Sequence, residues 1–324
     1  MKRFALPALS IAGSIAFYLV LVFVASLSAA TPTMPVAHAS QTSAQPAQRT
    51  LDTFPMALTV ATHTISSQVL KRNLPYLVYR PAASIADERF PVLYLLHGLS
   101  ADCTQWQGIG VVREADKLIA RGAIPPMVIV MPSGEDGYWM NHRPDGPRWR
   151  DYLITELIPT VEAQEPIQAM RELRAIGGIS AGGHGALQLA WNNPQLFAIA
   201  GAHSPGLRTE RDAFAFFGKG LDYERRDPVT LAKQVARLDL DIWIDTGDSD
   251  PWRARAETLH QTLDERGIKH IFRPQPGGHD GQYWAGRVGE YLTFYGTALA
   301  RRQNAVASRA ATLTDSAEAA FAAP

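Results

Sequence analysis

The sequence contains a single cysteine, Cys103, among 324 residues. A chain with one cysteine cannot form an internal disulfide, so its core alone must hold the fold together. The sequence also lacks net charge, because 31 Lys and Arg residues balance 31 Asp and Glu residues, and it contains no long basic run. These absences argue against nucleic acid as the main partner. Nothing around Cys103 indicates an activated thiolate, so we interpret it as a small residue near a loop.

Repeats and metal-binding motifs are also missing from the sequence. No segment recurs along the chain, and no histidines and acids have the spacing of a recognised metal site. We therefore predict neither a metal nor a cofactor. Apolar residues make up 46% and charged residues 19% of the chain, which is a globular balance and excludes an intrinsically disordered protein.

The N-terminal part of the chain differs in composition from the rest. Residues 1–30 place two basic residues before a long uncharged run that ends in small residues, the order of a secretory signal peptide. Because this run is long enough to span a bilayer, residues 4–30 could instead remain as a membrane tether. Residues 31–56, rich in Pro, Ala, Thr, Ser and Gln, are predicted to be a linker. We expect a secreted protein, periplasmic or extracellular, or one anchored by an uncleaved N-terminal segment.

Strand-like and helix-like segments alternate through residues 57–300, which we interpret as one catalytic domain. Three of the buried strands are predicted in the segments FPVLYLLHG, MVIVMP and RAIGGIS. This alternation predicts an α/β fold with a mostly parallel central sheet and helices on both faces. We expect residues 206–236 to form an insertion or partial lid over one edge of the sheet. Residues 301–324 have little apolar periodicity and are predicted to be a disordered tail.

A candidate nucleophile lies in the segment Gly178-Ile179-Ser180-Ala181-Gly182, which fits the pattern G-x-S-x-G. The pattern alone is weak, since it occurs by chance in roughly one chain in ten of this length. Its context is more specific, because an apolar strand precedes it and a helical run follows, as a nucleophile elbow requires. The alternative is a glycine-rich turn with a bystander serine.

A serine nucleophile needs a base, and in this arrangement the chain order is serine, then acid, then histidine. His279 lies in a glycine-rich loop before the last predicted helix and fits the base. Three acids, Asp245, Asp248 and Asp250, lie at or just after a predicted strand, and any of them satisfies the order.

An oxyanion hole requires two backbone N–H groups that point at the developing negative charge. One is expected from Ala181, the residue after the nucleophile. The other is expected from the loop after an early strand, where Gly98 permits a turn that would direct the Leu99 N–H into the site.

The other histidines have less specific interpretations. His97 ends an early strand and is interpreted as a structural hydrogen-bonding residue beneath the oxyanion loop. His184 lies one turn into the elbow helix and is interpreted as a packing residue. His142 and His203 could line the pocket, but neither has the place of the base in chain order.

In these segments, the chain resembles the esterase D and antigen 85 branch of the α/β-hydrolases, and the resemblance extends over most of residues 57–295. The matching segments are LYLLHGLSADCTQW, MVIVMPSGEDGYWMN, YLITELIPTVE, GGISAGGHGALQLAWNNPQLFAIAGAHSP, DIWIDTGDSDPW and PGGHDGQYW. The resemblance implies the α/β-hydrolase fold and a serine hydrolase. It assigns the acid to Asp250 through the pattern G-x-x-D, with Asp248 as the second choice. It also assigns the oxyanion donors to Leu99 and Ala181.

The branch includes S-formylglutathione hydrolases, secreted feruloyl-type esterases, small-acyl esterases and mycolyltransferases. The cytosolic S-formylglutathione hydrolases typically have Ser-Gly where this chain has His97-Gly98, and they lack an export signal, so we do not expect that reaction. Three aromatic residues, Trp106, Tyr138 and Trp139, follow strand ends on the expected active-site edge. They could line an acyl or aryl pocket, or they could be ordinary loop packing.

Together these observations predict a secreted serine carboxylesterase that acts on a small-molecule, carbohydrate or lipid ester. Ser180 would attack the ester, His279 would be the base, and Asp250 would orient the imidazole. The first alternative is an acyltransferase of the antigen 85 type that uses a sugar or alcohol acceptor. The second is a non-catalytic surface-binding protein, which a complete triad in the expected order argues against.

Overall fold

The computed structural model describes residues 60–81, 88–235 and 239–321, with side chains described up to residue 312. The predicted signal peptide or anchor (1–30) and the predicted linker (31–56) lie outside the described residues. Within the described ranges, we find no helix with the length and apolar character that a membrane crossing requires.

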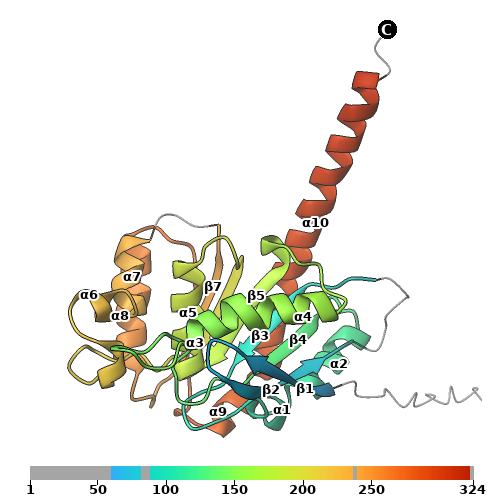
Figure 1. The fold of residues 1–324 in the computed structure, drawn as a ribbon. Coiled ribbons are helices and arrows are strands. Elements are labelled where there is room, and N and C mark those ends of the chain that lie inside the picture. The colour runs from blue at the N-terminus through green and yellow to red at the C-terminus, as the bar shows by residue number, and fades with distance from the viewer. Residues whose placement is uncertain (1–59, 82–87, 236–238, 322–324) are drawn as a thin grey trace, which may run out of the picture. The chain divides into compact units, whose positions relative to one another are not determined.

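An eight-stranded sheet forms the centre of the fold (Figure 1). Its spatial order is β1-β2-β4-β3-β5-β6-β7-β8. Only β2 runs antiparallel to its neighbours, and the remaining pairs are parallel. The strands are β1 (Val60–Ser67), β2 (Arg72–Tyr79), β3 (Val92–Leu96), β4 (Val128–Pro132), β5 (Arg174–Ile179), β6 (Ile199–His203), β7 (Asp241–Gly247) and β8 (Ile271–Gln275). This mostly parallel sheet confirms the predicted fold class.

Helices connect the parallel strands. The α-helices are α1 (Gln105–Gly108), α2 (Val111–Ala120), α3 (Trp149–Asp151), α4 (Ile158–Gln164), α5 (Ala181–Asn192), α6 (Leu221–Glu224), α7 (Pro228–Gln234), α8 (Arg253–Glu265), α9 (Gly281–Ala285) and α10 (Val288–Phe321). A π-helical segment, η1 (Tyr152–Leu157), joins α3 to α4, and two short 3-10 turns are η2 (Arg171–Leu173) and η3 (Ala215–Phe217).

The hydrophobic core has two halves, one on each face of the sheet. Successive side chains of a strand point to opposite faces, and β3 shows this alternation. Val92 and Tyr94 pack with the face covered by α4, α5, α7 and α8, whereas Leu93 and Leu95 pack with the face covered by α2, α9 and α10. Because both faces are covered, β3 is buried along its whole length, as its continuous apolar sequence predicted.

The C-terminal helix corrects the prediction of a disordered tail over residues 301–321, the part of the tail that the structure describes. Helix α10 continues to Phe321, well beyond residue 300. This segment is rich in alanine, the residue with the strongest intrinsic helix propensity, so it extends a helix without an apolar face of its own. Residues 304–312 are mostly exposed, but Arg302 is buried.

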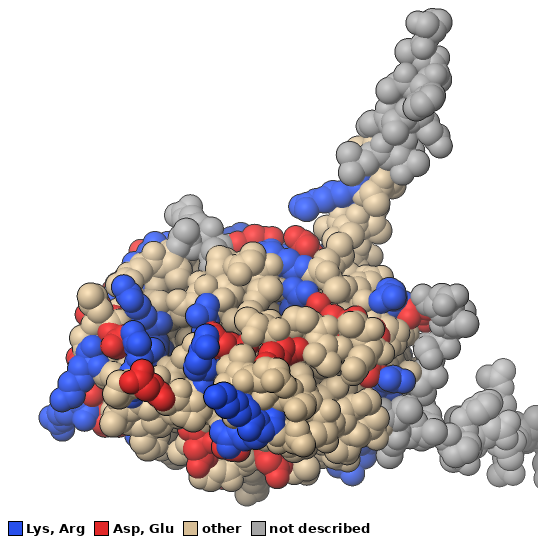
Figure 2. Space-filling view, in the orientation of Figure 1, with Lys and Arg blue, Asp and Glu red and all other residues tan. Residues whose placement is uncertain are grey.

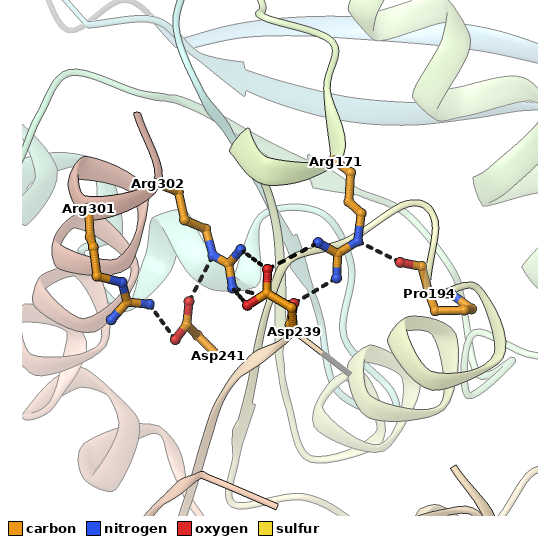
Figure 3. A network of polar contacts seen from close by, with 6 residues as sticks. All are labelled: Arg171, Pro194, Asp239, Asp241, Arg301 and Arg302. Carbon is orange, nitrogen blue, oxygen red and sulfur yellow. Dashed lines mark hydrogen bonds and ion pairs between the residues drawn. The ribbon is translucent and has the colours of Figure 1, made fainter. Parts of the chain in front are cut away.

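A network of arginines and aspartates binds α10 to the amino end of β7 (Figure 3). Arg302 donates from Nε to Asp241 Oδ2 over 2.8 Å and from Nη1 to Asp239 Oδ2 over 3.0 Å. Arg171, from η2, donates to the backbone carbonyl of Asp239 over 2.6 Å, and Arg301 pairs with Asp241. The structural domain therefore extends at least to Arg302.

Acidic and basic side chains lie interspersed on the face shown in Figure 2, as expected of a chain whose formal charges balance. Several form ion pairs between neighbouring segments. For example, Arg143 pairs with Asp222 over 3.1 Å, and Arg226 donates to the same carboxylate over 3.5 Å. Ion pairs between exposed side chains such as these contribute little to the stability of the fold.

Candidate active site

Ser180 lies in a sharp turn between β5 and α5. Its backbone has φ +55° and ψ −115°, a region that a non-glycine residue rarely occupies. The neighbouring segment after β6 holds this turn from outside. The Ser180 N–H donates to the carbonyl of His203 over 3.0 Å, and the Ser180 carbonyl accepts from the N–H of Gly206 over 2.9 Å. The strained turn projects the side chain beyond the carboxyl edge of the sheet.

Two glycines make the turn sterically feasible. A Cβ atom at Gly178 would lie 2.3 Å from the carbonyl oxygen of Gly182. A Cβ atom at Gly182 would in turn lie 2.3 Å from the carbonyl oxygen of Leu96, at the end of β3. These backbone approaches are closer than any side chain allows. The glycines in G-x-S-x-G therefore let α5 begin directly against two strands.

The structure brings Ser180, His279 and Asp250 into one hydrogen-bonded chain. The Ser180 Oγ lies 2.8 Å from His279 Nε2, and His279 Nδ1 lies 3.0 Å from Asp250 Oδ2. With the Nδ1 proton donated to Asp250, Nε2 is free to accept the serine proton. Each residue follows the carboxyl end of a different parallel strand: β5, β7 and β8. That shared edge is why residues 99 positions apart in the chain meet.

The other two candidate acids lie outside this chain of hydrogen bonds. Asp248 accepts from the N–H of Gly277 over 3.1 Å and from the hydroxyl of Ser249 over 3.1 Å, so it shapes the loop that carries His279. Asp245 lies within β7, and its carboxylate is buried. Geometry thus agrees with the G-x-x-D assignment of the acid to Asp250.

Asp250 is buried and fully hydrogen-bonded. Its side chain is 0% exposed, and Oδ1 accepts from the N–H of Trp252 over 2.7 Å. Burial raises the pKa of the carboxyl, but hydrogen bonds from His279, Ser204 and Trp252 outweigh it, so the pKa of Asp250 lies below its ordinary value. The carboxylate is therefore ionised at neutral pH and can stabilise an imidazolium.

Ser204 is a functional candidate that the sequence analysis missed. It follows the carboxyl end of β6 in a left-handed conformation, φ +50°, and is fully buried. Its hydroxyl donates to Asp250 Oδ2 and lies 3.0 Å from His279 Nδ1. The available signal was a polar residue directly after a buried strand, at the same sheet edge as the nucleophile.

His203 belongs to a buried polar network and does not line a pocket, which corrects the prediction that it could. Its Nδ1 lies 2.8 Å from Asp245 Oδ1, and its Nε2 lies 2.8 Å from the hydroxyl of Tyr295. The Asp245 carboxylate also accepts from Trp243 Nε1 and from the hydroxyls of Tyr283 and Tyr291. Because the Ser204 N–H donates to the Asp245 carbonyl over 2.9 Å, this network fixes the backbone next to the triad.

The two predicted oxyanion donors lie on either side of Ser180. Ala181 is the first residue of α5, so its N–H has no carbonyl one turn earlier to bond. A Cβ atom at Gly98 would lie 3.3 Å from the Ser180 Cβ, which places the loop after β3 against the nucleophile. The Gly98 N–H is already donated to Gln105 Oε1 over 2.8 Å. The Leu99 N–H has no acceptor among the residues that the structure describes.

His97 supports this loop, as its structural interpretation predicted. Its Nδ1 donates to the carbonyl of Gly98 over 2.7 Å, and its Nε2 accepts from the N–H of Gly134 over 2.9 Å. Burial lowers the pKa of His97, so the ring is neutral and suited to this pair of bonds. Both ring nitrogens of His97 thus form hydrogen bonds with backbone groups, one in the loop after β3 and one in the loop after β4.

All three predicted pocket aromatics are buried, Tyr138 at 2% exposure, and two of them support the loop after β3. Trp106 and Trp139 are each 1% exposed. The indole of Trp106 donates to the carbonyl of Leu96 over 3.0 Å, and that of Trp139 donates to the carbonyl of His97 over 3.1 Å. They support the oxyanion loop from below and do not line a pocket. The sequence left both interpretations open, because an aromatic residue after a strand serves either purpose.

Tyr138 adjoins the nucleophile within a small apolar cluster. This cluster comprises Leu99, Tyr138, Met140, Ala181, Ala213, Phe214, Phe216, Phe217 and Tyr223. The ring of Tyr138 lies 5.2 Å from that of Phe217, and its hydroxyl accepts from Arg208 Nε over 3.1 Å. The predicted insertion, residues 206–236, therefore packs beside both oxyanion candidates. His184 packs edge-on against Tyr138, as expected of a packing residue.

His142 also lies in this region. Its ring stacks on Phe216 with 3.9 Å between the ring centroids, and its Nε2 lies 3.1 Å from the carbonyl of Gly137. Burial lowers the pKa of His142. Phe216 belongs to the apolar cluster, so His142 packs against the cluster through that ring.

Known proteins are similar to this chain in sequence and in fold. The model of the Esterase family, described as "Putative esterase", matches residues 67–294. An acetyl esterase of Caldicellulosiruptor saccharolyticus is 25% identical over 248 residues, which cover 67% of this chain and 91% of that protein. An esterase of Mycobacterium tuberculosis (strain ATCC 25618 / H37Rv) is 36% identical over 59% of this chain, which spans about half (48%) of that protein. A solved ferulic acid esterase matches with a TM-score of 0.68 and 26% identity, covering 74% of this chain and 98% of its own.

Proposed function

This chain belongs to the Esterase family, and on that premise we propose that it hydrolyses carboxylic esters through an acyl-enzyme on Ser180. The observation that carries this proposal is the hydrogen-bonded chain from Ser180 through His279 to Asp250. Serine alone is a weak nucleophile at neutral pH, and an adjacent imidazole held by a carboxylate is the arrangement that activates it.

The proposed reaction has two halves. Ser180 Oγ attacks the ester carbonyl while His279 Nε2 takes its proton, and the buried Asp250 carboxylate stabilises the imidazolium. The N–H groups of Leu99 and Ala181 bind the negative oxygen of the tetrahedral intermediate. The intermediate collapses as His279 returns the proton to the leaving alcohol. His279 then takes a proton from water, which attacks the acyl carbonyl. The second intermediate collapses as His279 returns that proton to Ser180 Oγ, which releases the acid and the free serine. No cofactor takes part.

The proposed substrates are small acyl or aryl esters, on a small molecule, a carbohydrate or a lipid. Two matched proteins support this class by name, one an acetyl esterase and one a ferulic acid esterase. The apolar cluster supports it as well, because Leu99, Phe214 and Phe216 are only partly buried and belong to the same cluster as Ala181, the residue after the nucleophile. They offer an apolar wall to an acyl group that is bound there.

We also propose that the protein is exported. The support is the order of residues 1–30, in which Lys2 and Arg3 precede a long uncharged run and small residues follow. This segment would act either as a cleaved signal peptide or as a membrane tether. Fractionation of cells into periplasm, medium and membrane, with N-terminal sequencing of the protein, distinguishes the two. Recovery of the intact chain from the cytosol would contradict export.

The activity is tested with the purified full chain on aryl esters whose acyl groups run from acetyl to long-chain, together with a feruloyl ester. We expect hydrolysis by the wild type and a loss of roughly 10⁴-fold or more in Ser180→Ala. Retention of activity in Ser180→Ala would contradict the serine mechanism. Adding a sugar or alcohol acceptor tests the acyltransferase alternative, since an acylated acceptor in place of free acid identifies transfer. A folded wild type that uses no ester would overturn the proposal.

A further inference from the structure

A cluster of two histidines and one aspartate lies away from the triad, between the end of α8 and the start of β8. His260 and Asp264 are one turn apart on α8, and His270 directly precedes β8. Each offers one ligand atom, and these atoms all lie within 4.8 Å of one another. Imidazole nitrogen and carboxylate oxygen together are donors that Zn²⁺ and related divalent metals prefer.

His270 is oriented as a metal ligand would be. Its side chain is only 3% exposed. Its Nδ1 lies 2.8 Å from the carbonyl of Ile268, so Nδ1 carries the ring proton and donates it. Nε2 therefore presents a lone pair, and it points at His260 Nδ1, 2.8 Å away. A backbone carbonyl that fixes the tautomer of a histidine is the usual outer support of a metal-binding imidazole.

His260 is positioned by its own contacts. Its ring stacks on Phe272 of β8 with 4.4 Å between ring centroids and an interplanar angle of 11°. With its Nδ1 proton shared with His270, a neutral His260 presents the lone pair of Nε2 toward Asp264 Oδ2, only 3.4 Å away. Two acceptors facing each other is unfavourable. A metal ion between the two rings would take the place of the shared proton, the His260 proton would move to Nε2, and the carboxylate would turn toward the metal, so that the two acceptors would no longer face each other.

We propose that His260, Asp264 and His270 bind one divalent transition metal ion, with Zn²⁺ as the preferred ion and water in the remaining position. Tetrahedral coordination with bonds of about 2.05 Å separates two nitrogen ligands by about 3.3 Å, so the two rings need to open by only about 0.5 Å. Asp264 is 62% exposed and can rotate to supply the oxygen. The sequence analysis predicted no metal because three residues and then five separate these ligands, which is not a recognised pattern.

The place of the cluster in the fold gives the proposed ion a structural role. Asp250 lies in the loop just before α8, and His279 lies in the loop after β8, so the proposed acid and base lie at one end of this helix–strand pair. The cluster joins the other end of the same pair. A bound ion would therefore stabilise the unit that carries two of the three triad residues without touching the ester.

The test uses the full chain without a polyhistidine tag, treated with chelator and then titrated with Zn²⁺ by calorimetry. We expect one ion per chain and a rise of a few degrees in the thermal unfolding midpoint at saturating Zn²⁺. Binding of Co²⁺ in its place should give the visible absorption of tetrahedral coordination. His260→Gln and Asp264→Asn should each weaken Zn²⁺ binding by at least about 10-fold.

The matched control is His63→Gln, which replaces another partly exposed histidine, 28% exposed, that lies beside Glu165. This variant should bind Zn²⁺ as the wild type does. The metal-free His260→Gln variant should unfold at the wild-type temperature, which separates loss of a ligand from loss of the fold. The absence of binding would overturn the proposal. Binding that survives in a chain with both His260→Gln and Asp264→Asn would also overturn it, because the ion would then lie elsewhere, for example at the triad.

Discussion

At the scale of single residues, Ser204 connects the backbone after β6 to the proposed catalytic acid. Its hydroxyl donates to Asp250 and lies 3.0 Å from His279 Nδ1, so it fixes the carboxylate at the position from which the imidazole is oriented. We expect Ser204→Ala to lower kcat by roughly 10- to 100-fold, because a hydrogen bond to a charged group contributes about 1.5–3 kcal/mol. KM should change little, since the hydroxyl does not reach the proposed acyl site. Steady-state kinetics on an aryl ester measure both constants.

Ser249→Ala is the control for this prediction. Ser249 lies next to Asp250 in the same loop, but its hydroxyl bonds Asp248 over 3.1 Å, so kcat should remain at the wild-type value. Thermal unfolding of each variant reports on the fold. If Ser204→Ala lowers the unfolding midpoint while kcat is unchanged, Ser204 is a packing residue and not a positioning residue.

The hydrogen-bonded arrangement of Ser180, His279 and Asp250 was predictable from the sequence, and the contacts that support it were not. Ser180 and His279 stand in short glycine-rich segments whose order along the chain is itself informative. The contacts of Ser204 and His203 depend on β6 lying between β5 and β7, which no local pattern encodes. Trp106 and Trp139 show the same limit, because only the three-dimensional structure shows that their indoles bond backbone carbonyls beneath the oxyanion loop.

At the scale of elements, the junction of β5 and α5 depends on backbone surfaces that touch directly. We expect Gly182→Ala to lower the free energy of unfolding by roughly 3 kcal/mol or more, because its Cβ would lie 2.3 Å from the Leu96 carbonyl and the backbone must move apart. Urea unfolding measures this loss.

Gly108→Ala is the matched control, since no atom lies within 4 Å of the Cβ position at Gly108 on α1. Alanine is also the better helix former there, so the free energy of unfolding should stay the same or rise. Equal stability of the two variants would show that α5 can shift away from β3 at little cost.

Most elements were predictable because their periodicity reflects burial. The continuous apolar runs of β3, β4 and β5 predicted strands covered on both faces, and the structure places them at the centre of the sheet. The C-terminal segment was predicted wrongly because residues 304–312, beyond the buried Arg302, are mostly exposed and carry no apolar periodicity. Its helix arises from alanine propensity and from continuation of a helix that packs on the sheet upstream, and a search for apolar periodicity detects neither.

At the scale of the whole molecule, α10 and β7 are joined through Arg302. We expect Arg302→Ala to lower the free energy of unfolding by roughly 1–3 kcal/mol, because it removes a buried guanidinium that bonds both Asp239 and Asp241. Chemical denaturation of the full chain measures the change.

Two truncations separate this anchor from the exposed remainder of the helix. A chain that ends after residue 303 keeps Arg302 and should retain wild-type stability, since residues 304–312 are mostly exposed. A chain that ends after residue 300 loses Arg302 and should unfold at a lower denaturant concentration. Equal stability of the two would mean that the arginine network adds nothing to the fold.

The contact between Arg302 of α10 and β7 also determines where a support or fusion partner can be attached without blocking the proposed active site. Asp241 is the first residue of β7, so Arg302 binds at the amino edge of the sheet, whereas Ser180 follows a strand at the carboxyl edge. Residues 304–321 add roughly 27 Å of helix beyond that anchor. A solid support or a fusion partner joined to the C-terminal residues is thus attached through a rigid spacer at the edge opposite the proposed active site. When the enzyme is immobilised through this end, Ser180 should remain accessible, even to esters carried on large polymers.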